Sequence, residues 1–104
     1  AARDVLEATA SDGRRVRSGI VEANVVTGSA RAAAGDTAAA VAAWNSALAG
    51  ARALAEGPGG EEFAPLLAEV LLRLGQDTEA RPILAALRQR GYGEPELWML
   101  AGGQ

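Results

Sequence analysis

The stretch GSARAAAGDTAAAVAAWNSAL, residues 28–48, decides the fold. It joins a small residue at Gly28 to a Gly35-Asp36 pair, and Ala40, Trp44 and Ala47 follow Gly35 at offsets of five, nine and twelve. The same offsets recur 40 positions later, where Gly75 is followed by Ala80, Leu84 and Leu87. Such self-similarity is typical of stacked helical hairpins, each too small to bury its apolar face alone. Proteins built in this way bind other proteins more often than they catalyse.

Composition limits the chain to a single modest domain, residues 1–104. Apolar residues make up 49%, and much of that share is alanine. The core therefore has to come from close helix approach, and the four aromatic residues are the expected anchors. They are Trp44, Phe63, Tyr92 and Trp98.

Charge and residue types exclude several classes of function. The net charge is −3, so a nucleic-acid surface is not expected. Cysteine and histidine are absent, which removes disulfides, thiolate nucleophiles, zinc-finger ligands and histidine bases. We expect no enzyme activity, cofactor or metal site, and no apolar run long enough to cross a membrane. Since the first residue is Ala rather than Met, we expect a piece of a larger bacterial protein, located in the cytoplasm.

Apolar spacing predicts a first hairpin over residues 14–56, preceded by a short helix at 3–10 that ends at the Ser11-Asp12-Gly13 turn signal. In the helix 14–34 the apolar residues predicted to face inward are three or four residues apart. Gly35 is predicted to end this helix and Asp36 to cap the next one. The stripe consists of Val16, Ile20, Ala23, Val26 or Thr27, Ala30 and Ala34. The second helix, 37–55, is predicted to face inward with Ala40, Val41, Trp44, Leu48 and Leu54.

The Gly- and Pro-rich residues predict a loop over 57–62, a second hairpin over 63–91 and a terminal helix over 95–101. Pro65 suits the first turn of a helix, where a missing N–H costs little. Gly75 should end that helix, Asp77 or Thr78 should cap the next, and Pro82 lies early enough in it to be tolerated. No period-two alternation is long enough for a strand, so the predicted class is all-α: about two antiparallel hairpins plus a short terminal helix.

These residues resemble the tetratricopeptide repeat over about residues 21–90. In that family a small residue lies where the two helices of a hairpin cross, which fits Gly28 and Ala68, and the helices are joined by a Gly-Asp-type turn. The resemblance implies a protein-interaction or scaffolding module with a peptide groove. Two features depart from the family: Asn24 and Ala64 replace its early aromatic residue, and the period is 40 rather than 34. The run 91–97 also resembles the helical tail of large bacterial signalling proteins, among them some serine/threonine kinases.

The residues expected to face a groove are Arg17, Asn24, Arg31 and Glu69. The first three are seven residues apart and so share one face of a helix. A cluster at Arg14, Arg15 and Arg17 could clasp an acidic peptide terminus, although a solvated helix start explains it more simply. The expected partner is a protein or peptide of unknown identity.

The main alternative is a structural helical tail or self-association element, forming a homodimer, attached to a kinase or a DNA-binding regulator. A groove binder should show a concave surface lined by Arg and Asn, whereas a tail should expose Val5, Leu6, Val25 and Trp98.

Three positions report on packing. Trp44 is predicted to be buried between the hairpins. Trp98 is predicted to cap the core, with exposure to a partner as the alternative. At Gly28, leucine is expected to force the helices apart, whereas alanine is expected to be tolerated.

Overall fold

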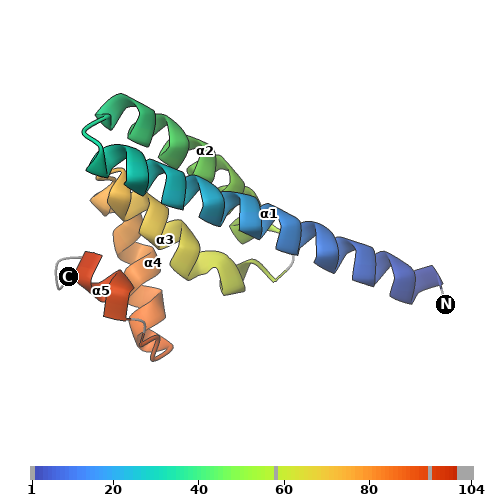
Figure 1. Ribbon diagram of the computed structural model, residues 1–104. Helices are drawn as coiled ribbons and strands as arrows, with labels where there is room; N and C mark the ends of the chain where they lie inside the picture. Colours follow the sequence, from blue (N-terminus) through green and yellow to red (C-terminus); the bar gives the residue numbers. More distant parts are fainter. Residues whose placement is uncertain (1, 58, 94, 101–104) are drawn as a thin grey trace.

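The computed structural model describes residues 2–57, 59–93 and 95–100, with the side chains of 13–57, 59–93 and 97–100. Its elements are α1 (Ala2–Ala33), α2 (Thr37–Glu56), the 3-10 helix η1 (Gly60–Phe63), α3 (Ala64–Arg73), α4 (Asp77–Gln89) and α5 (Pro95–Leu100). Figure 1 shows α1 and α2 as one hairpin, with α3 and α4 following against it and α5 beside them. The predicted all-α class is confirmed. Residue 101, the predicted end of the terminal helix, lies outside the described residues.

Helix α1 runs without interruption from Ala2 to Ala33, so the predicted separate helix at 3–10 is wrong. Serine, aspartate and glycine at residues 11–13 weaken a helix, but a glycine in a helix costs only about 1 kcal/mol, and no proline forces a break. The N-terminal part of α1 extends beyond the other helices in Figure 1.

Three glycines end helices as the sequence predicted, each in the left-handed backbone region. At Gly35, with φ of +85°, the Asp36 N–H donates to the Arg31 carbonyl at 2.9 Å and the Gly35 N–H donates to the Ala32 carbonyl at 3.0 Å. At Gly75 and Gly91 the glycine N–H and the N–H of the following residue donate to carbonyls of the preceding helix in the same way. This pattern satisfies carbonyl groups that the helix end would leave unpaired, and glycine reaches it without steric cost.

The starts of α2 and α4 differ although they occupy equivalent positions. The Asp36 carboxylate accepts a hydrogen bond from the Ala39 N–H at 3.1 Å, which confirms the predicted cap of α2. The corresponding residue before α4 is Gln76, whose side chain makes no cap bond, so the prediction of a cap at Asp77 or Thr78 is wrong. The Gln76 carbonyl accepts from Ala80 at 3.2 Å, and the helix has therefore already begun at Asp77.

The core lies where α2, α3 and α4 meet, with one face of α1 and the start of α5 against it. Its buried residues are Val21, Val25, Ala47, Leu48, Ala51, Leu54, Ala68, Val70, Leu71, Leu72, Ala80, Leu84, Leu87 and Leu97. An ion pair between Arg52 and Glu79, 2.5 Å apart, joins α2 to α4 at the surface.

The rotation of α1 differs from the prediction. Val21 and Val25 are the buried side chains, while Val16, Ile20 and Val26 point into solvent. The predicted inward stripe is therefore wrong, and so is the inward position of Val41 on α2, which is 38% exposed. The reason is steric: Gly28 and Gly50 leave room for the Trp44 ring and for Val21 on the facing helix, and these contacts select the face.

Trp44 lies within the first hairpin rather than between the two hairpins, so its predicted place is wrong. The half-buried ring covers Gly28, and its Nε1–H donates to the Val25 carbonyl at 3.3 Å. A Cβ atom at Gly28 would overlap Nε1 and lie 2.5 Å from Cδ1 of this ring. Alanine at Gly28 is therefore not tolerated without moving the indole.

We expect Gly28→Ala to lower the free energy of unfolding by about 1–3 kcal/mol, because a rigid ring has to shift. The matched control is Gly19→Ala in the same helix, where a Cβ meets nothing within 4 Å. That change should raise stability by up to about 1 kcal/mol through helix propensity. Urea denaturation of both variants measures the difference, and equal stabilities would contradict the Trp44 contact.

Candidate functional site

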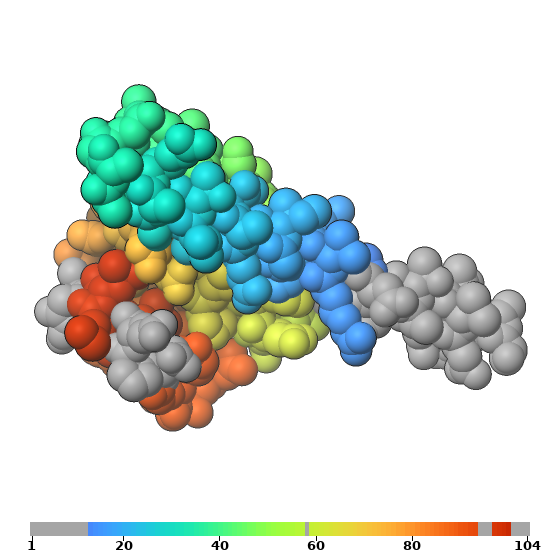
Figure 2. Space-filling model, in the orientation of Figure 1, coloured from blue at the N-terminus to red at the C-terminus, as the bar shows by residue number. Residues whose placement is uncertain are grey.

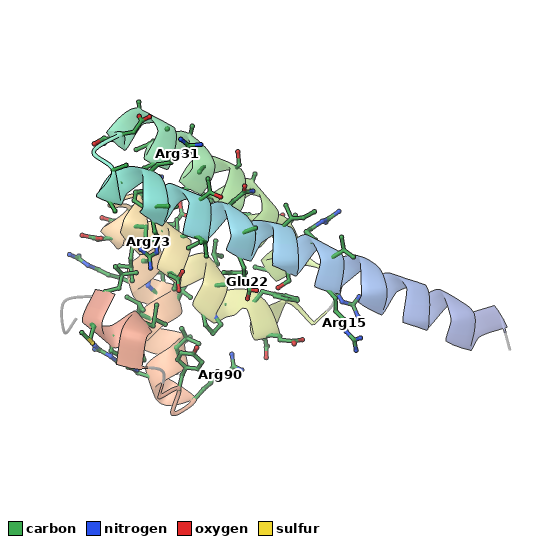
Figure 3. All side chains as sticks on the ribbon, viewed as in Figure 1. Arg15, Glu22, Arg31, Arg73 and Arg90 are labelled. Carbon is green, nitrogen blue, oxygen red and sulfur yellow. The ribbon has the colours of Figure 1, made fainter. Side chains whose placement is uncertain are left out.

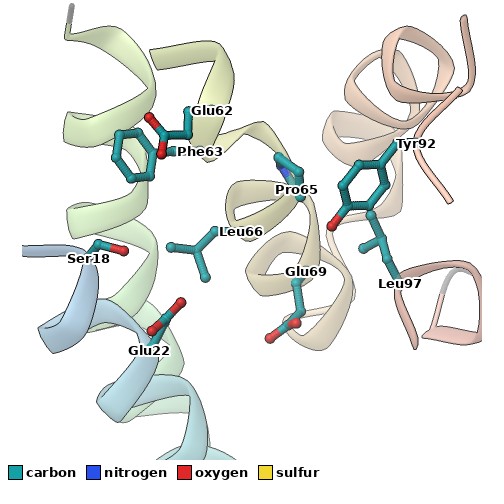
Figure 4. A pocket seen from close by; sticks show the side chains of 9 residues that line it. All are labelled: Ser18, Glu22, Glu62, Phe63, Pro65, Leu66, Glu69, Tyr92 and Leu97. Atoms are coloured by element: carbon teal, nitrogen blue, oxygen red, sulfur yellow. The ribbon is translucent and has the colours of Figure 1, made fainter. Parts of the chain in front are cut away.

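A concave groove lies between α1 and α3 and reaches the C-terminal segment. Its volume is about 440 Å³, within the range of roughly 300–1,000 Å³ that is common for ligand pockets. We call it the α1–α3 groove, and it is drawn in Figure 4. Its lining residues are Ser18, Glu22, Glu62, Phe63, Pro65, Leu66, Glu69, Tyr92 and Leu97.

The wall on the side of α3 follows from the local sequence. The 3-10 helix η1 places Glu62 and Phe63 just before α3, and Pro65 occupies the first turn of that helix. Glu62, Leu66 and Glu69 are four and three residues apart, so successive turns present them on one side. The opposite wall comes from α1, where Ser18 and Glu22 are one turn apart and face Leu66 (Figure 4).

Three carboxylates surround an apolar floor in this groove. The floor is formed by partly buried Phe63 and Leu66 and by buried Leu97. Glu69 lies 3.5 Å from Arg73 in an ion pair one turn along α3. Glu22 and Glu62 are exposed and form no ion pair with any other residue that the structure describes. The groove therefore offers apolar contact together with uncompensated negative charge.

The charge changes sign at the N-terminal end of the groove. A second hollow there shares Ser18, Glu22, Glu62 and Phe63 with the first and is also lined by Arg14, Arg15 and Gly19. Figure 3 shows Arg15 and Glu22 along α1, with Arg15 farther toward the N-terminus. A bound chain lying along α1 would therefore meet carboxylates first and then guanidinium groups.

An aromatic cluster closes the other end of the groove. The rings of Tyr92 and Trp98 meet edge to face with centroids 6.4 Å apart, and the Trp98 Nε1–H donates to the Tyr92 carbonyl at 3.0 Å. The Arg88 guanidinium lies 5.0 Å from the centroid of the Trp98 ring, a distance at which a cation is attracted to the ring face. Trp98 is half-buried against the core, which supports its predicted role as a cap. The cluster fixes Tyr92 as the end wall.

Of the four residues predicted from sequence to face a groove, the structure places only Glu69 in it. Glu69 lines the α1–α3 groove, whereas Arg17, Asn24 and Arg31 line neither this groove nor the hollow at its N-terminal end. Because a helix turns by about 100° per residue, Arg17 lies on a different flank of α1 from Ser18. The concave surface is thus lined by Glu where Arg and Asn were expected.

The sequence prediction missed Glu22 and Glu62, although a signal for them was present. They are 40 residues apart, the same interval as between Gly35 and Gly75, so they occupy one position in the two copies. Equivalent positions in stacked hairpins lie side by side, which brings two carboxylates to one groove. Of the residues expected to be exposed in a structural tail, Val25 is only 6% exposed, and the side chains of Val5 and Leu6 lie outside the described residues.

The part of the chain that the structure describes shows neither a metal site nor a helix that could span a membrane. No group of three or more acidic side chains is arranged to hold a metal ion there. In the same ranges, no helix combines the length and apolarity needed to cross a bilayer. Comparison of the chain with protein-family models, curated proteins and solved structures found no match.

Proposed function

We propose that this chain is a protein-interaction module whose α1–α3 groove binds a short peptide segment with apolar side chains flanked by basic ones. The observation that carries the proposal is the pairing of an apolar floor with Glu22, Glu62 and Glu69 around it. An apolar side chain would be removed from water against Phe63 and Leu66. Arginine or lysine beside it, on the side away from Arg14 and Arg15, would meet carboxylates.

Charge complementarity favours a basic partner over an acidic one. Carboxylates accept hydrogen bonds in pairs from a guanidinium, which makes arginine the best-matched side chain. An acidic peptide would instead place like charges together in a partly enclosed groove, where the cost is several kcal/mol at most. Glu22 and Glu62 are exposed, so each pair that they form with a peptide contributes only about 0.2–1 kcal/mol. Binding is therefore expected to be weak for the isolated domain.

The proposal includes a wider role as a scaffolding segment of a larger bacterial signalling protein in the cytoplasm. The resemblance to tetratricopeptide repeats and to the tails of signalling kinases supports this role. Recognition rather than catalysis is supported by the residue types, since the chain has no histidine, cysteine or lysine. The alternative is a structural tail, and it is favoured by the part of α1 that extends beyond the other helices. This alternative predicts that substitutions in the groove do not change the binding of any partner.

The test is a titration with two synthetic peptides that share an apolar centre of leucine and phenylalanine. One carries flanking arginines and the other carries glutamates at the same positions. The arginine peptide should bind more tightly, and Glu22→Lys/Glu62→Lys should weaken it about tenfold, since two attractive exposed pairs become repulsive. Fluorescence anisotropy of labelled peptides gives both Kd values.

The matched control is Glu56→Lys/Asp77→Lys, which changes the net charge equally at exposed residues that do not line the groove. This control should leave the arginine peptide's Kd within about twofold, because neither residue lines the groove and exposed charges are screened by salt. Circular dichroism checks that both variants remain helical. Equal loss of affinity in the two variants would mean that only net charge is sensed, and the groove assignment would fall.

A further inference from the structure

Helix α1 has an apolar side that no other part of the described structure covers. Three β-branched residues on it are mostly exposed: Val16 at 63%, Ile20 at 58% and Val26 at 67%. Figure 2 shows α1 as an uncovered ridge along this face of the molecule. We call this side the outer face of α1. It consists of Val16, Ile20, Ala23, Val26, Thr27 and Ala30.

The spacing of the outer face matches a helical partner. Val16, Ile20, Ala23, Thr27 and Ala30 are separated by four, three, four and three residues, which forms a nearly straight seam along a helix. Small residues at Ala23 and Ala30 allow a second helix to approach closely. An extended peptide would not repeat its contacts at these intervals, whereas an amphipathic helix does so at i, i+3, i+4 and i+7.

Charge distinguishes the two edges of the outer face. Arg17, Asn24 and Arg31 follow one edge at intervals of seven residues, and the positions at the same interval along the opposite edge are Asp12, Gly19, Val26 and Ala33. Arg17 and Arg31 are exposed and form no ion pair with any residue that the structure describes. They are separated by 14 residues, or about 21 Å of helix. A partner that matches this edge has carboxylates at the same interval.

A second copy of the chain does not supply that match. In an antiparallel pairing of two outer faces centred on Asn24, Arg17 of one copy would face Arg31 of the other. In a parallel pairing, the Arg31 edge would face uncharged residues such as Val26 of the second copy. The first arrangement is repulsive, and the second places Arg17 opposite the position of Asp12 but leaves the Arg31 guanidinium without a carboxylate.

We propose that the outer face of α1 docks an amphipathic helix with acidic residues along one edge, spaced to meet Arg17 and Arg31. This surface is distinct from the α1–α3 groove and binds a partner of opposite charge. It gives Arg17, Asn24 and Arg31 a shared role as one polar edge of a helix–helix contact. The groove and the outer face can therefore be occupied together.

The probe is a designed helical peptide of about four heptads with leucine and isoleucine along its seam. One version carries glutamate at intervals of seven on one edge, and its matched control carries lysine there. The 104-residue chain should bind the glutamate peptide about tenfold more tightly, because two exposed pairs change from repulsive to attractive. Arg17→Glu/Arg31→Glu should reverse this order, so that the lysine peptide binds more tightly.

Three controls show whether the peptide binds at the outer face itself. Ile20→Ser in the seam should weaken both peptides without loss of helicity, and Met99→Ser, at an exposed apolar residue on α5, should leave both Kd values unchanged. Equal binding of the two peptides to the wild-type chain would overturn the proposal, as would an absence of binding. Sedimentation equilibrium is the third control: a dimer that Ile20→Ser converts to a monomer would assign the face to a second copy instead.

Discussion

Replacing Gly60 with alanine is expected to cost about 3 kcal/mol of unfolding free energy, the upper part of the usual range for overpacking. Gly60 is buried, and a Cβ there would overlap the Ala55 carbonyl oxygen and lie 2.5 Å from the Ala55 carbonyl carbon. These are main-chain atoms at the end of α2, so they cannot turn aside as a side chain can. The change should separate α2 from η1 and with it widen the α1–α3 groove. Equilibrium urea unfolding, followed by circular dichroism, measures the loss.

Gly57→Ala, three residues earlier between α2 and η1, is the matched control. Gly57 has an extended backbone, and a Cβ there would meet the Ala53 oxygen at 3.5 Å, an ordinary contact. The free energy of unfolding of this variant should stay the same or rise by up to about 1 kcal/mol, because alanine restricts the conformations of the unfolded chain. If Gly60→Ala were as stable as Gly57→Ala, the close contact between η1 and α2 would be refuted.

Leu71→Ala should cost about 2–5 kcal/mol, because it empties a fully buried site in the core. Leu71 is on α3, which contacts α2, α4 and α5, so surrounding side chains cannot easily collapse into the space. For a domain of this size the loss can approach the whole free energy of unfolding. The measurement is the thermal midpoint, together with the urea midpoint where a folded baseline remains.

Met99→Ala is the comparison for that change. Met99 is 80% exposed at the end of α5, and its truncation should alter stability by less than about 0.5 kcal/mol. Similar midpoints for the two variants would show that α3 does not lie at the centre of the core.

Local signals in the sequence predicted most of the element boundaries. The glycines at 35, 75 and 91 adopt positive φ, and this requirement can be read from a single residue type. Asp36 and Pro65 also act within one helical turn of their own position. Such features depend on nearby backbone alone, so the sequence was sufficient to predict them.

The rotation of α1 could not be predicted in the same way. Alanine, valine and small residues occur on several sides of this helix, and two apolar stripes fit a helical period equally well. The choice depends on where α2 approaches, and Trp44 against Gly28 and Gly50 against Val21 decide it. These are contacts between distant residues, and the periodicity of one helix does not contain them. The resemblance to tetratricopeptide repeats stays a prediction.

The groove residues were predicted only in part, for a related reason. Glu69 was identified, but its companions on α1 depend on the rotation of that helix. The spacing of seven residues selected one edge of α1, which carries Arg17, Asn24 and Arg31. The groove lies along a different side of this helix. Glu22 and Glu62 are separated by the same 40 residues as Gly35 and Gly75, and both line the groove, so that interval is the better guide.

The most direct test of the proposed function is to locate the bound arginine peptide on the ¹⁵N-labelled chain by NMR chemical-shift mapping. We predict that the amide signals that move most belong to Glu22, Phe63, Leu66 and Glu69, with smaller changes at Ile20 and Val26. The glutamate-flanked control peptide should leave the groove signals in place. Shifts concentrated on the outer face of α1, or equal shifts with both peptides, would contradict the assignment of peptide recognition to the α1–α3 groove.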